Sequence, residues 1–581
     1  MENRSITVYY KNEIMRYHVL ATDYDGTLAT DEWVLAEVIV ALKKLKASGR
    51  KIIMVTGREL NDLQRVFPEY GMFDCIVAEN GAVIFNPATL QVRLLGKRPP
   101  DIFINKLKEL KVSPISTGRV IVATWEPHQA TILNAIKESG LEYQVIFNKG
   151  AVMILPPGIN KAKGLHEALK GMGLSEHNTV AVGDAENDNA MLQAAECAVA
   201  VNNALPQVKA IADWTTARSH GDGVCDLIDG LLRDDLASLD KKLHRHFMKL
   251  GKCKDGSVFR ISPQRQRMLL VGTSGSGKTT LTAAFVERLI EKQYQFCLID
   301  PEGDYLDMLG VISIGDSSQP PIIENVIRLL SQAQQSVVVC FLAIQLTERP
   351  AFFNKLLSQI VTLQHSNGHP HFMILDEAHH LIPKDVPESF YNFQDGFTNF
   401  VAVTTKPDLV NHDFLKRINT VITMGDQPGQ TMTDFAKITG TIIKVEKDVV
   451  IDKGEVLVWQ KAINETVVVT CSIPGHLLQR HKRKYATGDM GVNSFYFRGP
   501  AQKLNLKANN LHTFIQMGSG VDDETWLYHL HRNDYTNWLR ASVKDEELAS
   551  SVQKSGAKDK NASVSREMIF KLISDRYTAA A

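Results

Sequence analysis

Short apolar runs that end in polar residues recur in the first half of the chain, and each predicts a buried strand. The first lies within His18–Leu28 and the second covers Lys51–Val55. Helical periodicity between them predicts a helix that begins at Thr30 or Asp31. Strand, helix and strand in this order predict a parallel α/β unit with its site at the carboxyl ends of the strands. The apolar stripe of that helix is Val34, Val38, Ala41, Leu42 and Leu45.

The chain between Thr56 and Lys161 is longer than one crossover needs, so a second, smaller α/β unit is expected there. Ile76–Phe85 has the pattern of two short strands around a turn. The helical and β-like stretches that follow are Asp101–Lys111, Arg119–Thr124, His128–Ser139, Tyr143–Phe147 and Val152–Leu155.

The second half repeats the α/β pattern after an amphipathic connector, Leu236–Gly251. A strand from Arg267 precedes a glycine-rich loop and a helix, Leu281–Lys292, and further apolar strands follow up to Thr470. Beyond residue 492 the expected elements are a short strand, Phe495–Phe497, helical spacing in Asp523–Leu539, a mobile polar loop, Ser550–Ser563, and a last helix, Ser565–Tyr577.

Composition limits the classes of partner. The 581 residues predict three to four domains, with 44% hydrophobic and 22% charged residues. Lys plus Arg and Asp plus Glu are 65 each, so no global basic field attracts nucleic acid. The basic run Gln479–Tyr485 could contact a phosphate backbone or form a solvated linker. No apolar run is long enough to span a membrane, and the seven cysteines lack a CxxC pair, which predicts reduced thiols and a cytoplasmic location.

Two acids, Asp23 and Asp25, follow the first strand on the same side of the chain. Acids held this close favour a bound cation. One carboxylate can attack phosphorus, and the other can move a proton to or from the leaving group.

Four segments in order resemble the haloacid dehalogenase (HAD) phosphatases: Asp23–Leu28, Lys51–Arg58, Gly158–Lys161 and Thr179–Asp188. The alternative is that these acids are ordinary turn and N-cap residues. The resemblance implies Asp23 as nucleophile, Asp25 as acid and base, and Thr56 with Lys161 on the phosphoryl oxygens. The metal ligands it implies for Mg²⁺ are Asp23, Asp25, Asp184 and Asp188.

The inserted unit resembles the cap of Cof-type and sucrose-phosphatase-type HAD enzymes, which closes over the site. The resemblance implies a small phosphorylated substrate bound by Gly57, Arg58, Asn80 and Asn187. For Arg58 a surface ion pair is the alternative.

The segment Gly272–Thr280 satisfies GxxxxGK[ST] between a strand and a helix, which predicts a P-loop that binds ATP. Lys278 would reach the outer phosphates, and Thr279 would bind Mg²⁺. The expected ATP-binding residues are Gly272, Thr273, Ser274, Gly275, Ser276, Gly277, Lys278, Thr279 and Thr280.

A Walker B segment follows at His371–His380, where Asp376 would hold Mg²⁺ and Glu377 would polarise the attacking water. With Asp300–Tyr305 and Asn419-Thr420, it resembles the HerA/FtsK branch of P-loop ATPases, which implies a homo-oligomer, possibly a hexamer. Thr404–Lys406 stand where that branch often has Gln.

Other charged candidates are less specific. Arg349 or Arg417 could serve a neighbouring subunit as an arginine finger or form ordinary ion pairs. His529, His531 and Asp534 could bind a metal or belong to a packed helix.

We therefore expect an α/β chain: a HAD Rossmann-like core with an inserted α/β cap, a RecA-like P-loop ATPase domain and a small, mostly helical C-terminal module. The expected boundaries are 1–235 for the phosphatase (core 15–80 and 156–235, cap about 81–155), 236–262 for a linker, 263–475 for the ATPase, 476–492 for a basic linker and 493–581 for the module.

The predicted function is a Mg²⁺-dependent phosphomonoester hydrolase fused to an ATPase. Two alternatives remain open from the sequence. One is an oligomeric DNA-associated ATPase or translocase whose phosphatase processes nucleotides or ends, as in phage defence. The other is an ATP-regulated scaffold with a metabolite phosphatase.

Overall fold

The computed structural model describes residues 15–306, 308, 310–391, 393, 397, 399–445, 449–471, 490, 494–500, 504–543 and 545–577. The fold class is α/β, as predicted, with a helical C-terminal region. Within the described ranges, no helix is both long and apolar enough to cross a membrane. The basic run Gln479–Tyr485 lies outside the described residues.

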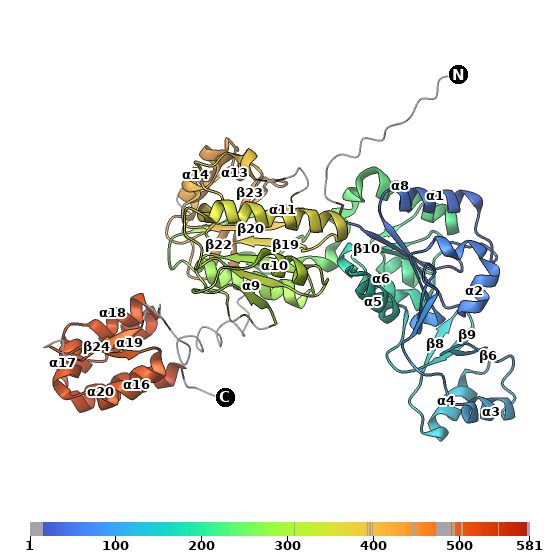
Figure 1. Cartoon of the computed structure of the whole chain (residues 1–581), viewed down its shortest axis with the longest axis horizontal. Helices are drawn as coiled ribbons and strands as arrows, with labels where there is room; N and C mark the ends of the chain where they lie inside the picture. Colours follow the sequence, from blue (N-terminus) through green and yellow to red (C-terminus); the bar gives the residue numbers. More distant parts are fainter. Residues whose placement is uncertain are drawn as a thin grey trace, which may run out of the picture. The chain divides into compact units, whose positions relative to one another are not determined.

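An eight-stranded sheet forms the core of the front part, in the order β12-β11-β10-β1-β2-β3-β4-β5. Helices α1 and α8 pack together on it, as do α5 and α6 (Figure 1). Its strands are β1 (Val19–Thr22), β2 (Lys51–Val55), β3 (Cys75–Ala78), β4 (Val83–Asn86), β5 (Gln91–Leu94), β10 (Thr179–Gly183), β11 (Cys197–Ala200) and β12 (Trp214–Thr215). The helices are α1 (Ala36–Ala47), α2 (Leu60–Val66), α5 (Lys161–Met172), α6 (Asn189–Ala194), α7 (Pro206–Ile211) and α8 (His220–Asp234).

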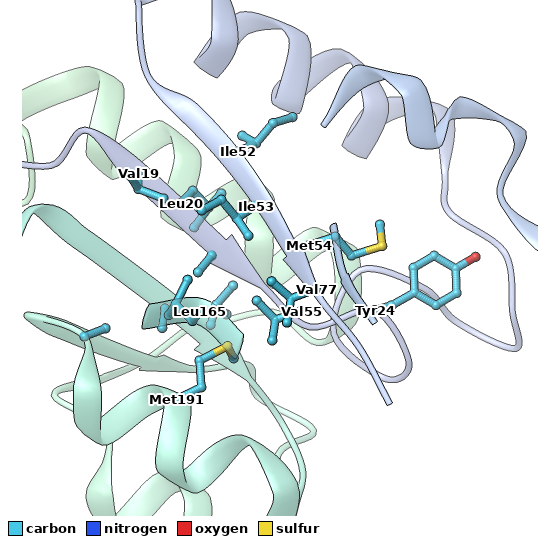
Figure 2. Packing of buried hydrophobic residues seen from close by; sticks show 14 of the residues in the cluster. Val19, Leu20, Tyr24, Ile52, Ile53, Met54, Val55, Val77, Leu165 and Met191 are labelled. Carbon is cyan, nitrogen blue, oxygen red and sulfur yellow. The ribbon is translucent and has the colours of Figure 1, made fainter. Parts of the chain in front are cut away.

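The central strand β1 is buried because both neighbours are parallel strands and helices cover the sheet. Figure 2 shows side chains of β1 and β2, such as Leu20 and Ile53, packed with Val77, Leu165 and Met191. This core fixes β1 in the middle of the sheet, so the residues after Thr22 leave at its carboxyl edge.

The inserted unit is a four-stranded antiparallel sheet with two helices. The sheet order is β6-β7-β9-β8, and apolar residues of α3, α4, β7 and β9 form a separate small core. The elements are α3 (Asp101–Glu109), β6 (Ser116–Thr117), β7 (Val122–Trp125), α4 (Gln129–Ser139), β8 (Gln144–Asn148) and β9 (Ala151–Leu155). Because β4 and β5 pair with β3, residues 83–94 belong to the core sheet and not to the predicted cap of 81–155.

An eleven-stranded sheet, in the order β14-β13-β23-β22-β21-β15-β20-β19-β16-β18-β17, forms the second half. The strands from β21 to β17 are parallel, and the other four are antiparallel. The strands are β13 (Met248–Cys253), β14 (Val258–Ile261), β15 (Arg267–Gly272), β16 (Phe296–Asp300), β17 (Ile312–Ile314), β18 (Val337–Cys340), β19 (Phe372–Leu375), β20 (Phe400–Thr404), β21 (Thr420–Met424), β22 (Glu455–Gln460) and β23 (Glu465–Cys471). The helices are α9 (Lys278–Glu291), α10 (Ile323–Leu330), α11 (Arg349–Asn367), α12 (Ala378–Leu381), α13 (His412–Lys416) and α14 (Pro428–Thr439).

The C-terminal module is a small helical unit around an aromatic core that includes Phe495, Phe514 and Trp526. Its elements are β24 (Phe495–Phe497), β25 (Leu506–Ala508), α16 (Leu511–Gly520), α17 (Asp523–His531), α18 (Asp534–Ala541), α19 (Glu546–Lys554) and α20 (Ala562–Tyr577). The expected helix over Asp523–Leu539 is two helices, because Asn533 adopts a left-handed conformation, φ 61°.

Three further local predictions are wrong. Helix α1 begins at Ala36, and neither Thr30 nor Asp31 caps it, because Thr30 bridges to Trp33. The predicted linker 236–262 contains β13 and β14, which join the second sheet through β23. The loop predicted at Ser550–Ser563 is largely helical, because α19 and α20 bury Leu548 and Ile569.

Candidate functional site

The first candidate site forms where β1 and β10 end side by side. The backbone N–H of Asp23 donates to the carbonyl of Val182 at 3.0 Å, which holds Asp23 at the carboxyl edge. The Asp23 side chain is buried, whereas the Asp25 side chain is 43% exposed. The two acids therefore lie in different environments despite their spacing.

Asp23, Asp184 and Asp188 form a buried cluster in which carboxylate oxygens lie within 4.8 Å of one another. Asp188 is fixed because its Oδ2 accepts from the backbone N–H groups of Asp184 and Ala185, each at 2.9 Å. Thr27 Oγ1 donates to Asp184 at 3.1 Å. Gly26 permits this approach: it has φ +82°, and a Cβ there would lie 2.4 Å from Asp184 Oδ2.

Lys161 lies between two of these acids. Its Nζ is 2.5 Å from Asp23 Oδ1 and 2.6 Å from Asp188 Oδ1, and the side chain is buried. Lys161 is the first residue of α5, where Asn160 caps the helix by accepting from the Lys163 N–H at 2.9 Å. Lys161 is thus positioned by a helix start.

Burial, and then repulsion from Asp188, raise the pKa of Asp23 well above its usual range, although Lys161 opposes the shift. Burial also raises the pKa of Asp184. Both shifts show that the cluster carries more negative charge than its buried surroundings stabilise. A divalent cation with a preference for hard oxygen ligands fits this donor set.

Arg58 makes ion pairs, which the sequence analysis gave as the alternative to substrate binding. Its guanidinium donates to Asp25 at 2.7–2.9 Å and also binds Glu32 and Asp62. The structure thus places Asp25 on Arg58 and outside the cluster of three acids. Thr56 lies nearby in the chain, and its Oγ1 accepts from the Arg58 N–H at 3.1 Å.

Three of the predicted substrate-binding residues, Gly57, Asn80 and Asn187, lie close together. Asn187 Nδ2 donates to Asn80 Oδ1 at 3.1 Å, and a Cβ on Gly57 would lie 3.5 Å from Asn187 Nδ2. Gly81 follows Asn80 with φ +104°, and a Cβ there would lie 2.0 Å from the Asn160 carbonyl. The turn after β3 therefore packs directly against the residue that precedes Lys161.

The sequence analysis missed two charged residues at or near the site, because neither belongs to a recognised motif. Lys149, at the tip of the β8–β9 hairpin, places Nζ 2.5 Å from Asp184 Oδ2. Glu79 is buried, and its carboxylate accepts from the N–H groups of Arg119, Val120 and Ile121 at 2.7–3.0 Å. Glu79 thus joins the inserted unit to the core.

The second candidate site lies at the carboxyl edge of the other parallel sheet. Strand β15 ends at Gly272, and the Walker A residues Thr273–Thr280 follow and enter α9. In this loop Gly275 and Gly277 have φ +81° and +101°, and Lys278 Nζ donates to the Thr273 carbonyl at 3.0 Å. The loop thus has the left-handed glycines that a phosphate cradle requires.

Asp300 is the last residue of β16 and Asp376 directly follows β19, and these two strands are neighbours in the sheet. Burial, and then Asp300 and Glu377, raise the pKa of Asp376 well above its usual range. Burial raises the pKa of Asp300 to about 6, although it accepts from backbone N–H groups of the turn up to Tyr305. Paired buried acids at this edge suit a divalent cation.

Glu377 lies next to two polar residues that the sequence did not assign. Its Oε2 is 3.3 Å from His379 Nδ1, and the same nitrogen is 3.0 Å from Thr404 Oγ1 at the end of β20. This chain thus has a His–Thr contact where the HerA/FtsK branch often has Gln after that strand.

The remaining candidates have structural partners. Arg349 donates to the carbonyls of Ile344 and Phe341, and Arg417 pairs with Glu388, so the structure gives no support to either as an arginine finger. In the C-terminal module, His529 contacts Asp534 at 2.9 Å and the Arg498 N–H at 3.0 Å. These contacts favour a packed helix over a metal site.

Comparison with known proteins identifies the class of the front part. The model for haloacid dehalogenase-like hydrolases matches residues 20–124 and 117–228. The chain is 30% identical over 223 residues to a phosphoglycolate phosphatase of Methanothermobacter thermautotrophicus, covering 36% of this chain and 96% of that relative. It is also 30% identical over 225 residues to phosphoglycolate phosphatase 2 of Saccharolobus solfataricus, covering 38% and 93%. The chain therefore belongs to the haloacid dehalogenase-like hydrolases through this region.

Two other comparisons concern a solved structure and the second half of the chain. A solved haloacid dehalogenase-like hydrolase from Bacteroides thetaiotaomicron is 19% identical, with a TM-score of 0.33, covering 37% of this chain and 99% of that one. The model for an AAA domain matches residues 262–409. The chain thus combines a phosphatase of the HAD type with a P-loop ATPase domain, which confirms the predicted enzyme class.

Proposed function

We propose that the front half hydrolyses small phosphomonoesters through an aspartyl-phosphate on Asp23. The observation that carries this proposal is the meeting of Asp23, Asp184, Asp188 and Lys161 at the carboxyl edge of the first sheet. Asp23, Asp184 and Asp188 would hold Mg²⁺, which when bound offsets the charge of the acids and of the phosphoryl group.

The residues then divide the work. An Asp23 oxygen attacks phosphorus, and the bond to the ester oxygen breaks as Asp25 gives that oxygen a proton. Water next attacks the phosphorus, Asp25 takes its proton, and the Asp23–phosphorus bond breaks to release phosphate. Lys161 and Thr56 hold the phosphoryl oxygens, while Arg58 orients Asp25.

For the second half, we propose that Gly272–Thr280 bind ATP, that Thr279 and Asp376 hold Mg²⁺, and that Glu377 polarises the attacking water. The glycine conformations of the loop and the paired acids Asp300 and Asp376 support this assignment. A homo-oligomer of the HerA/FtsK type and a nucleic-acid partner stay predictions.

The relatives named phosphoglycolate phosphatase support a small phosphorylated acid as the substrate class. The test is mass spectrometry of the full chain, acid-quenched during turnover of 2-phosphoglycolate with Mg²⁺. We expect a phosphate on Asp23, which EDTA abolishes and which Asp23→Asn lacks. Asp31→Asn, an exposed neighbour, is the matched control. Phosphate on another residue, or none during measurable turnover, contradicts the proposal.

A further inference from the structure

The β8–β9 hairpin of the inserted unit brings a lysine to the acid cluster. Lys149 and Gly150 form its tip, with φ +47° and +85°. Two successive positive φ values define a tight hairpin turn in which Asn and Gly are the favoured residues. A lysine in this conformation is strained, and such strain is typical of residues retained for function.

The side chain of Lys149 bridges the inserted unit and the core. Its Nζ lies 2.5 Å from Asp184 Oδ2 and would lie 2.8 Å from a Cβ on Gly26. The side chain is nevertheless 47% exposed, so the same ammonium group faces both the acids and the open space beside them.

Buried polar atoms without partners lie on the same hairpin and on the segment that follows β10. Among the described residues, the buried side-chain oxygens without a hydrogen-bond partner include four on the hairpin and on the segment after β10: Asn148 Oδ1, Glu186 Oε2, Asn187 Oδ1 and Asn189 Oδ1. Strand β8 contacts the Glu186–Asp188 turn directly. Unpaired buried acceptors are rare, and are expected where ordered water or a polar ligand completes the site.

We propose that Lys149 determines specificity by binding a second anionic group of the substrate, beyond the phosphate that is cleaved. This inference rests on the proposed function of the same site. When the acids hold a cation, Asp184 no longer needs the lysine, and the ammonium group then pairs best with a substrate carboxylate. In the small phosphorylated acid proposed above as the substrate, this second anionic group is the carboxylate.

The test compares 2-phosphoglycolate with its amide, 2-phosphoglycolamide, which has the same size but no carboxylate. For Lys149→Met we expect kcat/KM for phosphoglycolate to fall about 30-fold or more, mainly through KM, with a change below about threefold for the amide. Lys149→Arg should restore most of the loss for phosphoglycolate, because it keeps the charge. Lys137→Met, on the exposed face of α4, is the matched control and should change neither substrate.

The outcomes distinguish a failure of the Lys149 proposal from a failure of the proposed phosphatase function. If the unaltered chain hydrolyses neither substrate, the proposed function fails. If it hydrolyses both, and Lys149→Met lowers both equally, Lys149 only closes the inserted unit over the core and the inference is overturned. An unchanged preference for phosphoglycolate in Lys149→Met would also overturn it.

Discussion

Lys161 partly compensates the charge of the three carboxylates that are buried together at the site. Each buried charge loses hydration worth several kcal/mol, and only close opposite charges recover that loss. Its ammonium group is 2.5 Å from Asp23 and 2.6 Å from Asp188, while Asp184 depends on Lys149 and Thr27. The site thus has one buried cation, Lys161, and one half-exposed cation, Lys149, against three buried carboxylates.

Glu196 is another buried carboxylate, at the opposite edge of the sheet, directly before β11. It is fully buried, and its carboxylate accepts from Tyr294 Oη at 2.9 Å, from Gln264 Nε2 and from His177 Nδ1 at 2.7 Å. Although His177, Glu196 and His246 are close enough to hold a metal ion, these donors already satisfy the carboxylate. We therefore interpret the cluster as a hydrogen-bonded junction.

Glu196 should make the free energy of unfolding depend on pH in the acid range. Burial alone would raise its pKa, but His246 and His177 outweigh it and lower the pKa from 4.5 to about 2. Because the folded pKa is the lower one, ionised Glu196 stabilises the fold above pH 4.5, and this contribution is lost as pH falls toward 2. Glu196→Gln should cost about 3 kcal/mol at pH 7 and about half of that at pH 3.

Urea unfolding at the two pH values measures this difference. Glu69→Gln, on an exposed residue, is the control and should cost little at either pH. An equal loss for Glu196→Gln at pH 7 and pH 3 would show that its ionised form does not stabilise the fold.

Single residues were predictable from the sequence where spacing along the chain marks them. Asp23, Lys161, Asp184 and Asp188 belong to segments in a fixed order, so the family resemblance implies their roles from the sequence alone. Lys149 belongs to none, because its importance depends on how a hairpin folds back over the core. The Arg58–Asp25 pair was one of two alternatives, since spacing does not show which partner a long side chain selects.

At the scale of elements, apolar runs bounded by polar residues predicted β1, β2 and β15 correctly, because these parallel strands are buried on both faces. The errors fall where burial is partial. Strand β13 mixes buried and exposed residues over Met248–Cys253, which is also compatible with an amphipathic connector. Helix α19 has only three buried residues, so its sequence is typical of a polar loop.

The turn after β3 should control Lys161 from a distance. For Gly81→Ala, the new Cβ would meet the Asn160 carbonyl and displace the start of α5, so we expect kcat for phosphate release to fall at least about tenfold. Gly454→Ala is the matched control, because Gly454 has a positive φ close to that of Gly81, +92°, but nothing lies within 4 Å of its Cβ position.

Because the two φ values are similar, both variants carry similar backbone strain, about 1–3 kcal/mol, and the steric contact distinguishes them. Steady-state kinetics and thermal unfolding of the two proteins provide the comparison. Equal kinetics in the two variants would show that Gly81 does not position Lys161.

At the scale of the molecule, the phosphatase core and the ATPase sheet contact each other through the amino-terminal edges of their parallel strands. Asn178, which precedes β10, meets Gly368 and His371, which precede β19. Further contacts at these edges join His177 to Lys292, Gly173 to His369, and Glu196 to Tyr294 and Gln264. Since Asp23 and Asp376 follow the carboxyl ends of β1 and β19, they lie at the edges remote from this junction.

The junction therefore lies between Asp23 and Asp376. The sequence predicted both sets of residues but not this orientation, because it depends on dispersed contacts such as those of Asn178.

Parallel assays of phosphate release from 2-phosphoglycolate and from ATP, in Asp23→Asn and Lys278→Ala, test the central claim that one chain carries two separate phosphate-handling sites. We expect Asp23→Asn to lose only phosphoglycolate hydrolysis, and Lys278→Ala to lose only ATP hydrolysis, each by at least about a thousandfold. Loss of both activities in either folded variant, or retention of phosphoglycolate hydrolysis in Asp23→Asn, would contradict the account.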